Sequence, residues 1–200
     1  MMHERIIGLY EENAGAWDAV RGDTRLEAEW IDPFLALLPP GGSILDLGCG
    51  SGRPVAGYLI ERGFEVTGID SSPSLVALCR ERFANLDWHV ADMRRLDLGR
   101  RFDGLLAWHS FFHLGFDDQR AMFSRFAAHA APGAILMFTS GPEHGEAIGE
   151  WQGEPLYHSS LAQEEYRSLL AANGFEVLSF GTGEPLEAGP FVWLARYRLT

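Results

Sequence analysis

Short apolar segments alternate with helical segments through the middle of this chain. The segments 43–47, 64–69, 86–90, 102–108 and 134–139 are apolar enough to form buried strands, and residues with helical spacing fill most of the intervals between them. Strands that are separated by helices pair in parallel, with the helices packed on both faces of the sheet. The alternation therefore predicts an α/β fold built on a doubly wound, mostly parallel sheet.

Helical patterns precede the first of these strands. One covers residues 3–20 and the other covers 25–38, where it stops at two prolines followed by two glycines. A chain of 200 residues has room for one domain with small additions. We expect a single domain over 1–200, with a helical cap at 1–38 and a Rossmann-like core at 40–200.

The last third of the chain departs from the alternation. Residues 141–158 are rich in glycine, proline and polar side chains, and we expect them to form a long functional loop. A helix at 161–172 is followed by strands at 175–180 and 191–199, with no helix between these two strands. This order predicts an antiparallel hairpin at one edge of the sheet.

Charge and composition argue against several classes of protein. Sixteen basic and 28 acidic residues give a net charge of −12, with no basic stripe of the kind that nucleic-acid phosphates require. The N-terminal residues are charged, and no segment reaches the roughly 18–20 apolar residues of a membrane span. Cys49 and Cys79 are too few for a disulfide framework. We expect a soluble, cytoplasmic protein with buried, reduced thiols; the sequence carries no marker of an oligomeric state.

A glycine-rich loop follows the first core strand. The sequence DLGCGSG occupies 46–52, and glycines let a backbone turn tightly and approach a ligand closely. In an open α/β sheet, ligands bind beyond the carboxyl ends of the strands, which is where this loop lies. The dinucleotide pattern G-x-G-x-x-G/A fits poorly, because Arg53 holds the sixth position and the third glycine comes one residue early.

Carboxylates end three successive strands. An unpaired carboxylate at Asp46 would be costly at the tip of a buried strand, so it must meet either a ligand ammonium or a backbone amide. Asp70 can accept hydrogen bonds from both hydroxyls of a ribose, and Asp92 is placed to reach an adenine amino group. Together the three carboxylates are typical of a site for a nucleoside with a cationic tail.

These segments resemble the class I S-adenosylmethionine (SAM)-dependent methyltransferases over roughly residues 40–200. The matching sequences are ILDLGCGSG at 44–52, VTGID at 66–70, ADM at 91–93 and FDGLLAWHS at 102–110. The resemblance implies SAM as cofactor and S-adenosylhomocysteine (SAH) as product. No His, Cys and Asp cluster has the spacing of metal ligands, so we expect no metal.

The resemblance also implies which residues contact the cofactor. The glycines would shape the loop at its methionine side, Asp70 would bind the ribose, and Asp92 with Met93 the adenine. Aromatic and basic residues of the N-terminal helix would close over the site, although the same residues could pack as an aromatic stripe on the core. The expected cofactor residues are Tyr10, Trp17, Arg21, Asp46, Gly48, Cys49, Gly50, Gly52, Asp70, Ser71, Asp92, Met93 and Trp108.

Candidate catalytic and acceptor residues follow the later strands. Methyl transfer needs a general base only when the nucleophile retains its proton, and histidine titrates near neutrality. We single out His109, His113 and His158 as candidate catalytic residues, with packing as the alternative for His113. In the 141–158 segment we expect an acceptor-pocket wall that excludes water, the alternative being a solvated loop. Its candidate substrate-binding residues are Glu143, His144, Trp151 and Tyr157.

The acceptor is expected to be a small molecule, with a protein substrate as the alternative. The turn Asn/Asp-Pro-Pro-Tyr/Phe that accompanies methylation of DNA amino groups is replaced here by Ala107-Trp108-His109-Ser110. Two other functions stay open at this point. One is an NAD(P)-dependent oxidoreductase, which Arg53 disfavours, and the other is a non-catalytic module that binds a nucleoside.

Overall fold

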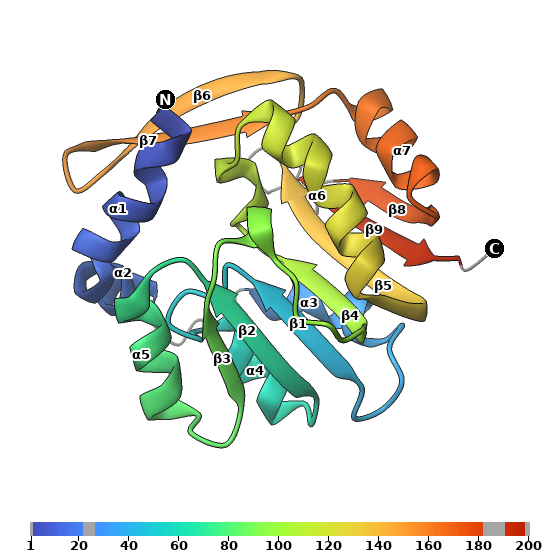
Figure 1. Ribbon diagram of the computed structural model, residues 1–200, viewed down its shortest axis with the longest axis horizontal. Helices are drawn as coiled ribbons and strands as arrows, with labels where there is room; N and C mark the ends of the chain where they lie inside the picture. Colours follow the sequence, from blue (N-terminus) through green and yellow to red (C-terminus); the bar gives the residue numbers. More distant parts are fainter. Residues whose placement is uncertain (1, 22–26, 182–190, 199–200) are drawn as a thin grey trace.

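A seven-stranded sheet forms the centre of the protein. The computed structural model describes residues 2–21, 27–181 and 191–198 (Figure 1). The strand order is β3-β2-β1-β4-β5-β9-β8. The first five strands in this order pair in parallel, and β9 pairs antiparallel with both β5 and β8. The strands are β1 Ser43–Leu47, β2 Glu65–Asp70, β3 Asp87–Val90, β4 Phe102–Ala107, β5 Ala130–Ser140, β8 Phe175–Gly181 and β9 Phe191–Tyr197.

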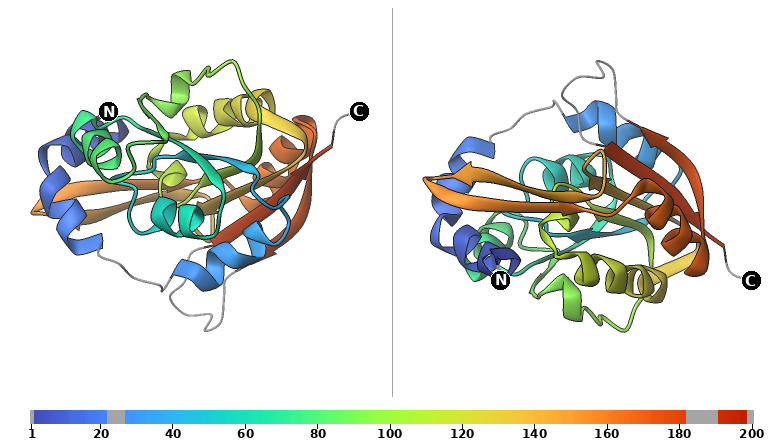
Figure 2. Two further views of the ribbon diagram at one scale, coloured as in Figure 1. Left: turned by 90° about the horizontal axis from the view of Figure 1, so that it is seen from below. Right: turned by 90° about the horizontal axis from the view of Figure 1, so that it is seen from above.

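Helices cover both faces of this sheet. One hydrophobic core lies between the sheet and α3, α4 and α5, and a second lies between the sheet and α6 and α7 (Figures 1 and 2). The predicted doubly wound sheet with an antiparallel edge hairpin is therefore confirmed. The helices are α3 Ala28–Leu35, α4 Val55–Glu61, α5 Pro73–Arg82, α6 Phe116–His129 and α7 Gln163–Ala172.

The alternation of side chains along β4 shows why the sheet is buried on both sides. Leu105 and Ala107 belong to the core under α6 and α7, whereas Leu106 and Trp108 belong to the core under α3, α4 and α5. Burial of one large apolar side chain contributes roughly 1.5–3 kcal/mol. Both cores therefore stabilise the strands, and they hold the carboxyl ends of β1, β2 and β4 at one edge.

Local signals fix where α5 begins. The Ser72 hydroxyl accepts a hydrogen bond from the Leu75 amide at 3.1 Å, and Pro73 occupies the first helical position. This N-cap directs the chain away from Asp70 at the end of β2.

A β-hairpin occupies residues 145–160, so the prediction of a loop over 141–158 was wrong from residue 145 onward. Strands β6 Gly145–Trp151 and β7 Glu154–Ser160 pair antiparallel as a separate two-stranded sheet. Gln152 and Gly153 connect them with positive φ angles of 54° and 81°, as a two-residue hairpin turn requires. The glycines, glutamates and proline of this segment have low strand propensity and hide the pairing from a propensity argument.

Residues 2–21 form three short helical pieces where one helix was predicted. They are the 3₁₀ turn η1 Met2–Arg5 and the helices α1 Ile6–Glu12 and α2 Ala14–Arg21. These pieces lie beside the β6–β7 hairpin and α5 in Figures 1 and 2. The prediction of a helix over 25–38 is matched by α3 in its middle, and residues 25 and 26 lie outside the described part of the chain.

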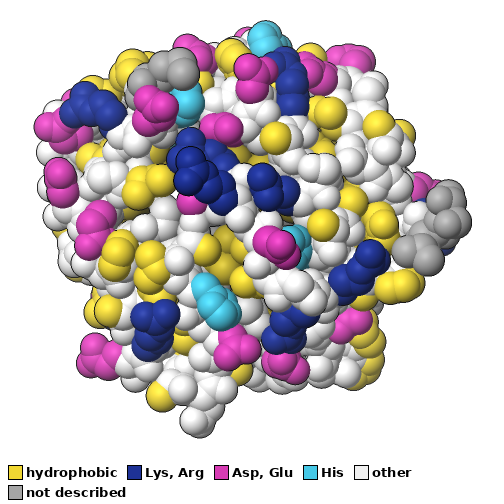
Figure 3. All heavy atoms as spheres, viewed as in Figure 1, with side chains coloured by type: hydrophobic (Ala, Val, Ile, Leu, Met, Phe, Trp, Pro, Cys, Tyr) yellow, Lys and Arg dark blue, Asp and Glu magenta, His cyan; other side chains and the backbone are white. Residues whose placement is uncertain are grey.

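Arginine and acidic side chains are interspersed over the face that Figure 3 shows. The protein as a whole carries a net charge of −12. Among the residues that the structure describes, no helix is both long and apolar enough to cross a membrane.

Candidate functional site

A pocket opens where β1, β2 and β4 end. Its walls come from the glycine loop, from the first residues after β2, β3 and β4, and from the N-terminal pieces η1, α1 and α2, which cover it. The lining residues are His3, Ile6, Ile7, Tyr10, Trp17, Gly48, Gly50, Ile69, Asp70, Ser71, Leu75, Ala91, Asp92, Met93, Arg94, His109, Ser110, His113 and Leu114.

The glycine loop has a backbone that only glycine adopts readily. Gly48 and Gly50 have φ angles of 79° and 55°. A Cβ on Gly48 would lie 2.4 Å from Cβ of Ser110, which is closer than two carbon atoms can approach. The amides of Gly48 and Cys49 both donate to the Ile69 carbonyl oxygen, at 2.8 and 3.0 Å. The loop is therefore held against β2 with its backbone facing the pocket.

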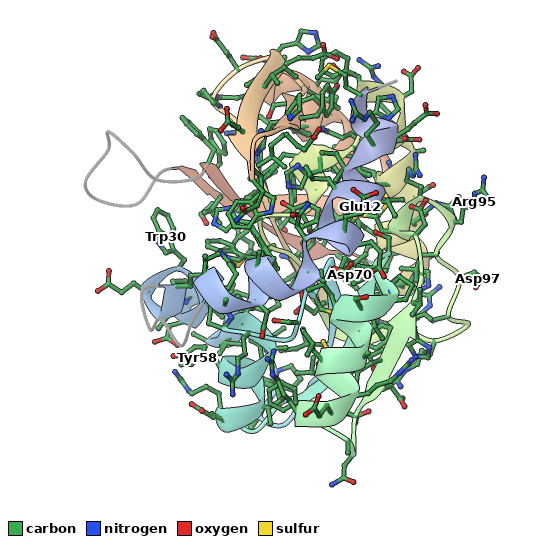
Figure 4. All side chains as sticks on the ribbon, turned by 90° about the vertical axis from the view of Figure 1, so that its left-hand side faces the viewer. Glu12, Trp30, Tyr58, Asp70, Arg95 and Asp97 are labelled. Carbon is green, nitrogen blue, oxygen red and sulfur yellow. The ribbon has the colours of Figure 1, made fainter. Side chains whose placement is uncertain are left out.

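Asp70 fixes the same loop from the end of β2. Its Oδ2 accepts a hydrogen bond from the Gly50 amide and its Oδ1 accepts one from the Ser72 amide, both at 2.9 Å. Burial raises the pKa of Asp70, and these amides act in the opposite direction. Asp70 lies close to the N-terminal helices (Figure 4) and lines the pocket together with Ser71.

Asp46 is a buried carboxylate without a donor. Its side chain is 3% exposed, and no residue of the described chain donates a hydrogen bond to it. Burial, Asp70 and Glu27 raise the pKa of Asp46 to about 7, and Arg21 opposes them. Of the two partners that the sequence left open, a backbone amide is not the one found. Asp46 is not among the residues that line the pocket, and its contact with a ligand ammonium stays a prediction.

Asp92 lines the pocket, but its carboxylate is engaged within the protein. Its Oδ2 accepts a hydrogen bond from Nη2 of Arg94 at 2.6 Å, and its Oδ1 accepts one from the Arg94 amide at 2.9 Å. Burial raises the pKa of Asp92, but the contacts with Arg94 outweigh it and lower the pKa overall. An adenine contact through Asp92 stays a prediction, while its neighbour Met93 lines the pocket beside it.

Trp17 and Arg21 bring the cap onto the glycine loop. A Cβ placed on Gly50 would lie 3.4 Å from Nε1 of Trp17. The Arg21 guanidinium lies 5.2 Å from the centre of the Trp17 ring and forms an ion pair with Glu27 at 3.0 Å. Trp17 therefore covers the loop, whereas Arg21 packs against Trp17 and is not among the residues that line the pocket.

Two polar contacts fasten the cap to α5. The Asp18 carboxylate accepts a hydrogen bond from Nη1 of Arg82 at 2.6 Å. The Glu11 carboxylate accepts hydrogen bonds from the Ser74 hydroxyl and amide, at 2.6 and 3.0 Å. Hydrogen bonds from Ser72 and from Ser74 lower the pKa of Glu11, and the contact with Arg82 lowers the pKa of Asp18 to about 2. Sequence reasoning did not identify these four residues, because their pairing depends on how the cap folds back.

His113 is held as a neutral ring. Its Nδ1 lies 2.7 Å from the Tyr157 carbonyl oxygen, which can only accept, so Nδ1 carries the proton. Its Nε2 lies 2.9 Å from the hydroxyl of Tyr10 and accepts from it. Burial lowers the pKa of His113 to about 3. In this arrangement His113 holds Tyr10 in place, and both ring nitrogens are occupied.

A second pocket adjoins the first through His109, which lines both. Its walls are the end of β5, the segment that leads into β6, and β7. The lining residues are His109, Phe112, Ser140, Gly141, Pro142, Glu143, His144, Gly145, Glu146, Ala147, His158, Ser159 and Ser160. Burial lowers the pKa of His109 to about 4 and also lowers the pKa of His158, so both rings are neutral at pH 7.

The acceptor residues expected in 141–158 divide into two groups. Glu143, His144 and His158 line the second pocket. Trp151 and Tyr157 are outside its lining: Trp151 packs edge-on against Trp17 at 5.4 Å between ring centres, and Tyr157 is buried, with its hydroxyl donating to Glu146 at 2.6 Å. Trp151 thus joins the hairpin to α2, and the Tyr157 hydroxyl joins the two strands of the hairpin to each other.

Four other predicted residues lie behind the pocket. Cys49 and Cys79 are free and buried, as expected. A Cβ on Gly52 would lie 3.3 Å from the Cys79 sulfur, which explains a third glycine in the loop. Trp108 is 5% exposed, and its ring centre lies 4.6 Å from that of His109. No group of three or more His, Cys, Asp or Glu side chains within the described ranges has an arrangement that could hold a metal ion.

Residues 21–180 match the family model described as "Methyltransferase domain". The chain is 30% identical over 185 residues to an O-methyltransferase of Pyrenophora dematioidea, covering 86% of this chain and 68% of the relative. It is 34% identical over 101 residues to the dTDP-3-amino-3,6-dideoxy-alpha-D-glucopyranose N,N-dimethyltransferase of Streptomyces fradiae, which covers 50% of this chain and 39% of that relative.

Solved structures show the same fold. The SAM-bound amino pentose methyltransferase CalS10 from Micromonospora echinaspora has a TM-score of 0.74 at 22% identity, covering 90% of this chain and 96% of that chain. The CcbJ methyltransferase from Streptomyces caelestis has a TM-score of 0.77 at 20% identity, and the match covers 97% of this chain and 98% of that chain. The region that matches the family model includes the glycine loop and the strand ends that border the two pockets. The chain belongs to the methyltransferase family that the sequence resembles, and not to the oxidoreductases.

Proposed function

We propose that this chain is a SAM-dependent methyltransferase that methylates a nitrogen or oxygen atom of a small polar acceptor. The first pocket would hold the cofactor and the second pocket would hold the acceptor. The observation that carries the proposal is that His109 lines both pockets, so a group bound in one lies beside a group bound in the other.

The residues present fit SAM on one decisive point. Asp46 is buried beside the glycine loop without a donor, and SAM has an ammonium group at its methionine end. Gly48 and Gly50 line the first pocket, and a side chain on Gly48 would collide with Ser110 at its wall. Asp70 would accept hydrogen bonds from the ribose, and Tyr10 and Trp17 would cover the site from above. When bound, SAM supplies a methyl group that its sulfonium sulfur already activates.

The chain's own part in the reaction is to hold the acceptor and exclude water. Methyl transfer forms one bond to the acceptor atom while the sulfur keeps the electron pair of the bond that breaks, so orientation is the main requirement. The neutral ring of His109 can accept a hydrogen bond from an acceptor hydroxyl or amine and direct its lone pair. A proton released from the acceptor would leave through water, because burial lowers the pKa of His109 to about 4.

Several relatives support a small polar acceptor. The Streptomyces fradiae relative and a second one from Saccharopolyspora spinosa are named as N,N-dimethyltransferases of dTDP-linked amino sugars, and they match this chain over 101 and 133 residues. The relative from Pyrenophora dematioidea is named as an O-methyltransferase. These names favour amino sugars and hydroxylated natural products as the first acceptors to screen.

The test is turnover with labelled cofactor. Purified protein would be incubated with SAM carrying a tritiated methyl group and with pools of amino sugars, hydroxylated aromatic compounds and glycopeptides. The proposal expects label in one acceptor and an equal amount of SAH. Calorimetry with SAH and with NAD measures cofactor preference independently of the acceptor.

Two outcomes would contradict the proposal. Binding of NAD in preference to SAH would overturn the cofactor assignment. Binding of SAH together with an absence of transfer to any pool, including a cell-metabolite extract, would favour the non-catalytic nucleoside-binding module instead. His109→Ala should abolish most of the transfer while SAH affinity changes by less than about threefold, which is about 0.65 kcal/mol.

A further inference from the structure

The second pocket carries negative charge at its opening. It is a cavity of about 490 Å³, within the range of roughly 300–1,000 Å³ that encloses a small molecule. Glu143 and Glu146 line it, and both side chains are exposed, so they lie where the cavity meets solvent. The Tyr157 hydroxyl donates to the Glu146 carboxylate at 2.6 Å and holds it there. A ligand that enters this pocket therefore passes two carboxylates.

No arginine balances these carboxylates among the described residues that line the second pocket. All 16 basic residues of the chain are arginines, so no lysine can take this part either. Burial lowers the pKa of His109 to about 4 and also lowers the pKa of His158, so neither ring is a cation at pH 7. A phosphate or carboxylate group on the acceptor would face like charges here, and like charges brought together oppose binding.

Uncharged rings form the inner wall of the pocket. The ring centre of Phe112 lies 5.9 Å from that of His109 and 5.1 Å from that of His158. His109 also lines the first pocket, so this wall borders the proposed cofactor site. An aromatic face attracts a cation. Partial desolvation against such a wall then lowers the pKa of an amine and favours the neutral form that can accept a methyl group.

The serine hydroxyls of this pocket are already engaged within the protein. Oγ of Ser140 donates to the Gly141 carbonyl oxygen at 3.0 Å. Oγ of Ser159 donates to the Leu114 carbonyl oxygen at 2.6 Å. Oγ of Ser160 accepts a hydrogen bond from the Gly141 amide at 2.6 Å. Recognition of an acceptor therefore falls mainly to the carboxylates at the opening and to the rings of the inner wall.

We propose that the acceptor is a basic amine without phosphate or carboxylate groups, which enters as an ammonium ion past Glu143 and Glu146 and is methylated on nitrogen. This inference rests on the proposed function, since it assigns the second pocket to the acceptor. It departs from the dTDP-linked sugars in the names of two relatives, because a dTDP group carries a diphosphate.

The chemistry of this step is balanced with water as the proton acceptor. The ammonium ion gives one proton to water at the uncharged wall. The nitrogen lone pair then forms the N–C bond to the methyl group, the S–C bond breaks, and its electron pair stays on sulfur. The products are SAH and a methylated ammonium ion.

A cell-metabolite extract that is separated by charge tests the acceptor class in the wild type. Ion exchange at pH 7 would divide the extract into cationic, neutral and anionic fractions, and each would be incubated with the protein and SAM carrying a tritiated methyl group. We expect the label in a compound of the cationic fraction. Tyramine, tyrosol and tyrosine would be added as a matched set that differs only in the amine and the carboxylate.

Glu143→Lys tests the charge at the opening of the pocket. Reversal of this exposed attraction should raise KM for the labelled amine by at least about fivefold, while SAH affinity stays within about threefold. Glu150→Lys is the matched control, because it makes the same change of charge at an exposed position of β6 outside both pockets. It should leave KM within about twofold. Melting temperatures of both variants report whether the fold is intact.

The results separate this inference from the proposed function. Transfer mainly to compounds of the neutral or anionic fraction would overturn the amine assignment and leave the methyltransferase function intact. Equal changes of KM in Glu143→Lys and Glu150→Lys would overturn entry past the pocket carboxylates. Binding of SAH without transfer to any fraction would overturn both proposals together.

Discussion

The hydroxyl of Tyr10 donates a hydrogen bond of 2.9 Å to Nε2 of His113. This contact joins the N-terminal cap to the turn after β4. The other ring nitrogen of His113 donates to the Tyr157 carbonyl oxygen in β7, so three segments that are remote in sequence meet at one imidazole. A charged imidazole would lose the bond from Tyr10, because Nε2 would then carry a proton.

The neutral state of His113 predicts a loss of stability in acid. Its pKa is about 3 in the folded protein and 6.5 in the unfolded chain, so the unfolded chain binds more protons between these values. The free energy of unfolding therefore falls as the pH drops below 6.5. Between pH 7 and pH 5, the free energy of unfolding of His113→Gln should therefore fall by about 2 kcal/mol less than that of the wild type. Urea denaturation at both pH values measures this, and parallel pH profiles would exclude the assignment.

Asp46 predicts the opposite dependence. Its pKa is 3.8 in the unfolded chain and about 7 in the folded protein, so the folded protein binds more protons between these values. Stability falls as the pH rises through this window. The free energy of unfolding of Asp46→Asn, measured relative to that of the wild type without ligand, should rise by roughly 2–4 kcal/mol from pH 4 to pH 8. Guanidinium denaturation at the two pH values checks it; a difference that stays constant with pH would rule it out.

Gly48→Ala should damage both the fold and cofactor binding. The new Cβ would meet Cβ of Ser110 at 2.4 Å in a backbone that already has a φ of 79°. Gly99→Ala is the control, because Gly99 has a φ of 62° and open space around it. The control should lower the free energy of unfolding by about 1–2 kcal/mol through backbone strain alone. Gly48→Ala should cost more and weaken SAH binding at least about tenfold. Similar losses in both variants, with normal SAH affinity, would contradict the crowding argument.

The β6–β7 hairpin predicts different kinetics for two of its residues. His158→Ala should lower kcat for methyl transfer and leave SAH affinity within about threefold, because His158 lines the pocket proposed for the acceptor. Trp151→Ala should instead weaken SAH binding, because Trp151 packs against Trp17 over the glycine loop. Calorimetry and steady-state kinetics on both variants separate the two effects. Identical profiles would mean that the hairpin acts as one unit.

The strand-end residues were predictable because their signals are local. A glycine that needs a positive φ, or an aspartate at the end of an apolar run, can be identified within a few residues of sequence. Gly48, Gly50 and Asp70 accordingly lie where the sequence predicts them, around one pocket. Asp92 also lies there, but its pairing with Arg94 depends on a side-chain conformation that spacing does not specify.

The hairpin and Glu27 were missed for a different reason. Gln152-Gly153 is a recognisable two-residue turn, but the flanking glutamates and glycines lack the apolar alternation of a strand. Glu27 has no motif around it at all. Its ion pair with Arg21 at 3.0 Å arises only in the tertiary structure.

The packing of Trp151 against Trp17 has a consequence for how such an enzyme can change its substrate. The hairpin that lines the proposed acceptor pocket also supports the N-terminal helices over the first pocket, with a further ion pair between Arg5 and Glu154 at 3.4 Å. A hairpin transplanted from a relative would bring new acceptor contacts and lose its fit to the first 21 residues. A design that exchanges the β6–β7 hairpin to change the acceptor therefore has to exchange the first 21 residues with it.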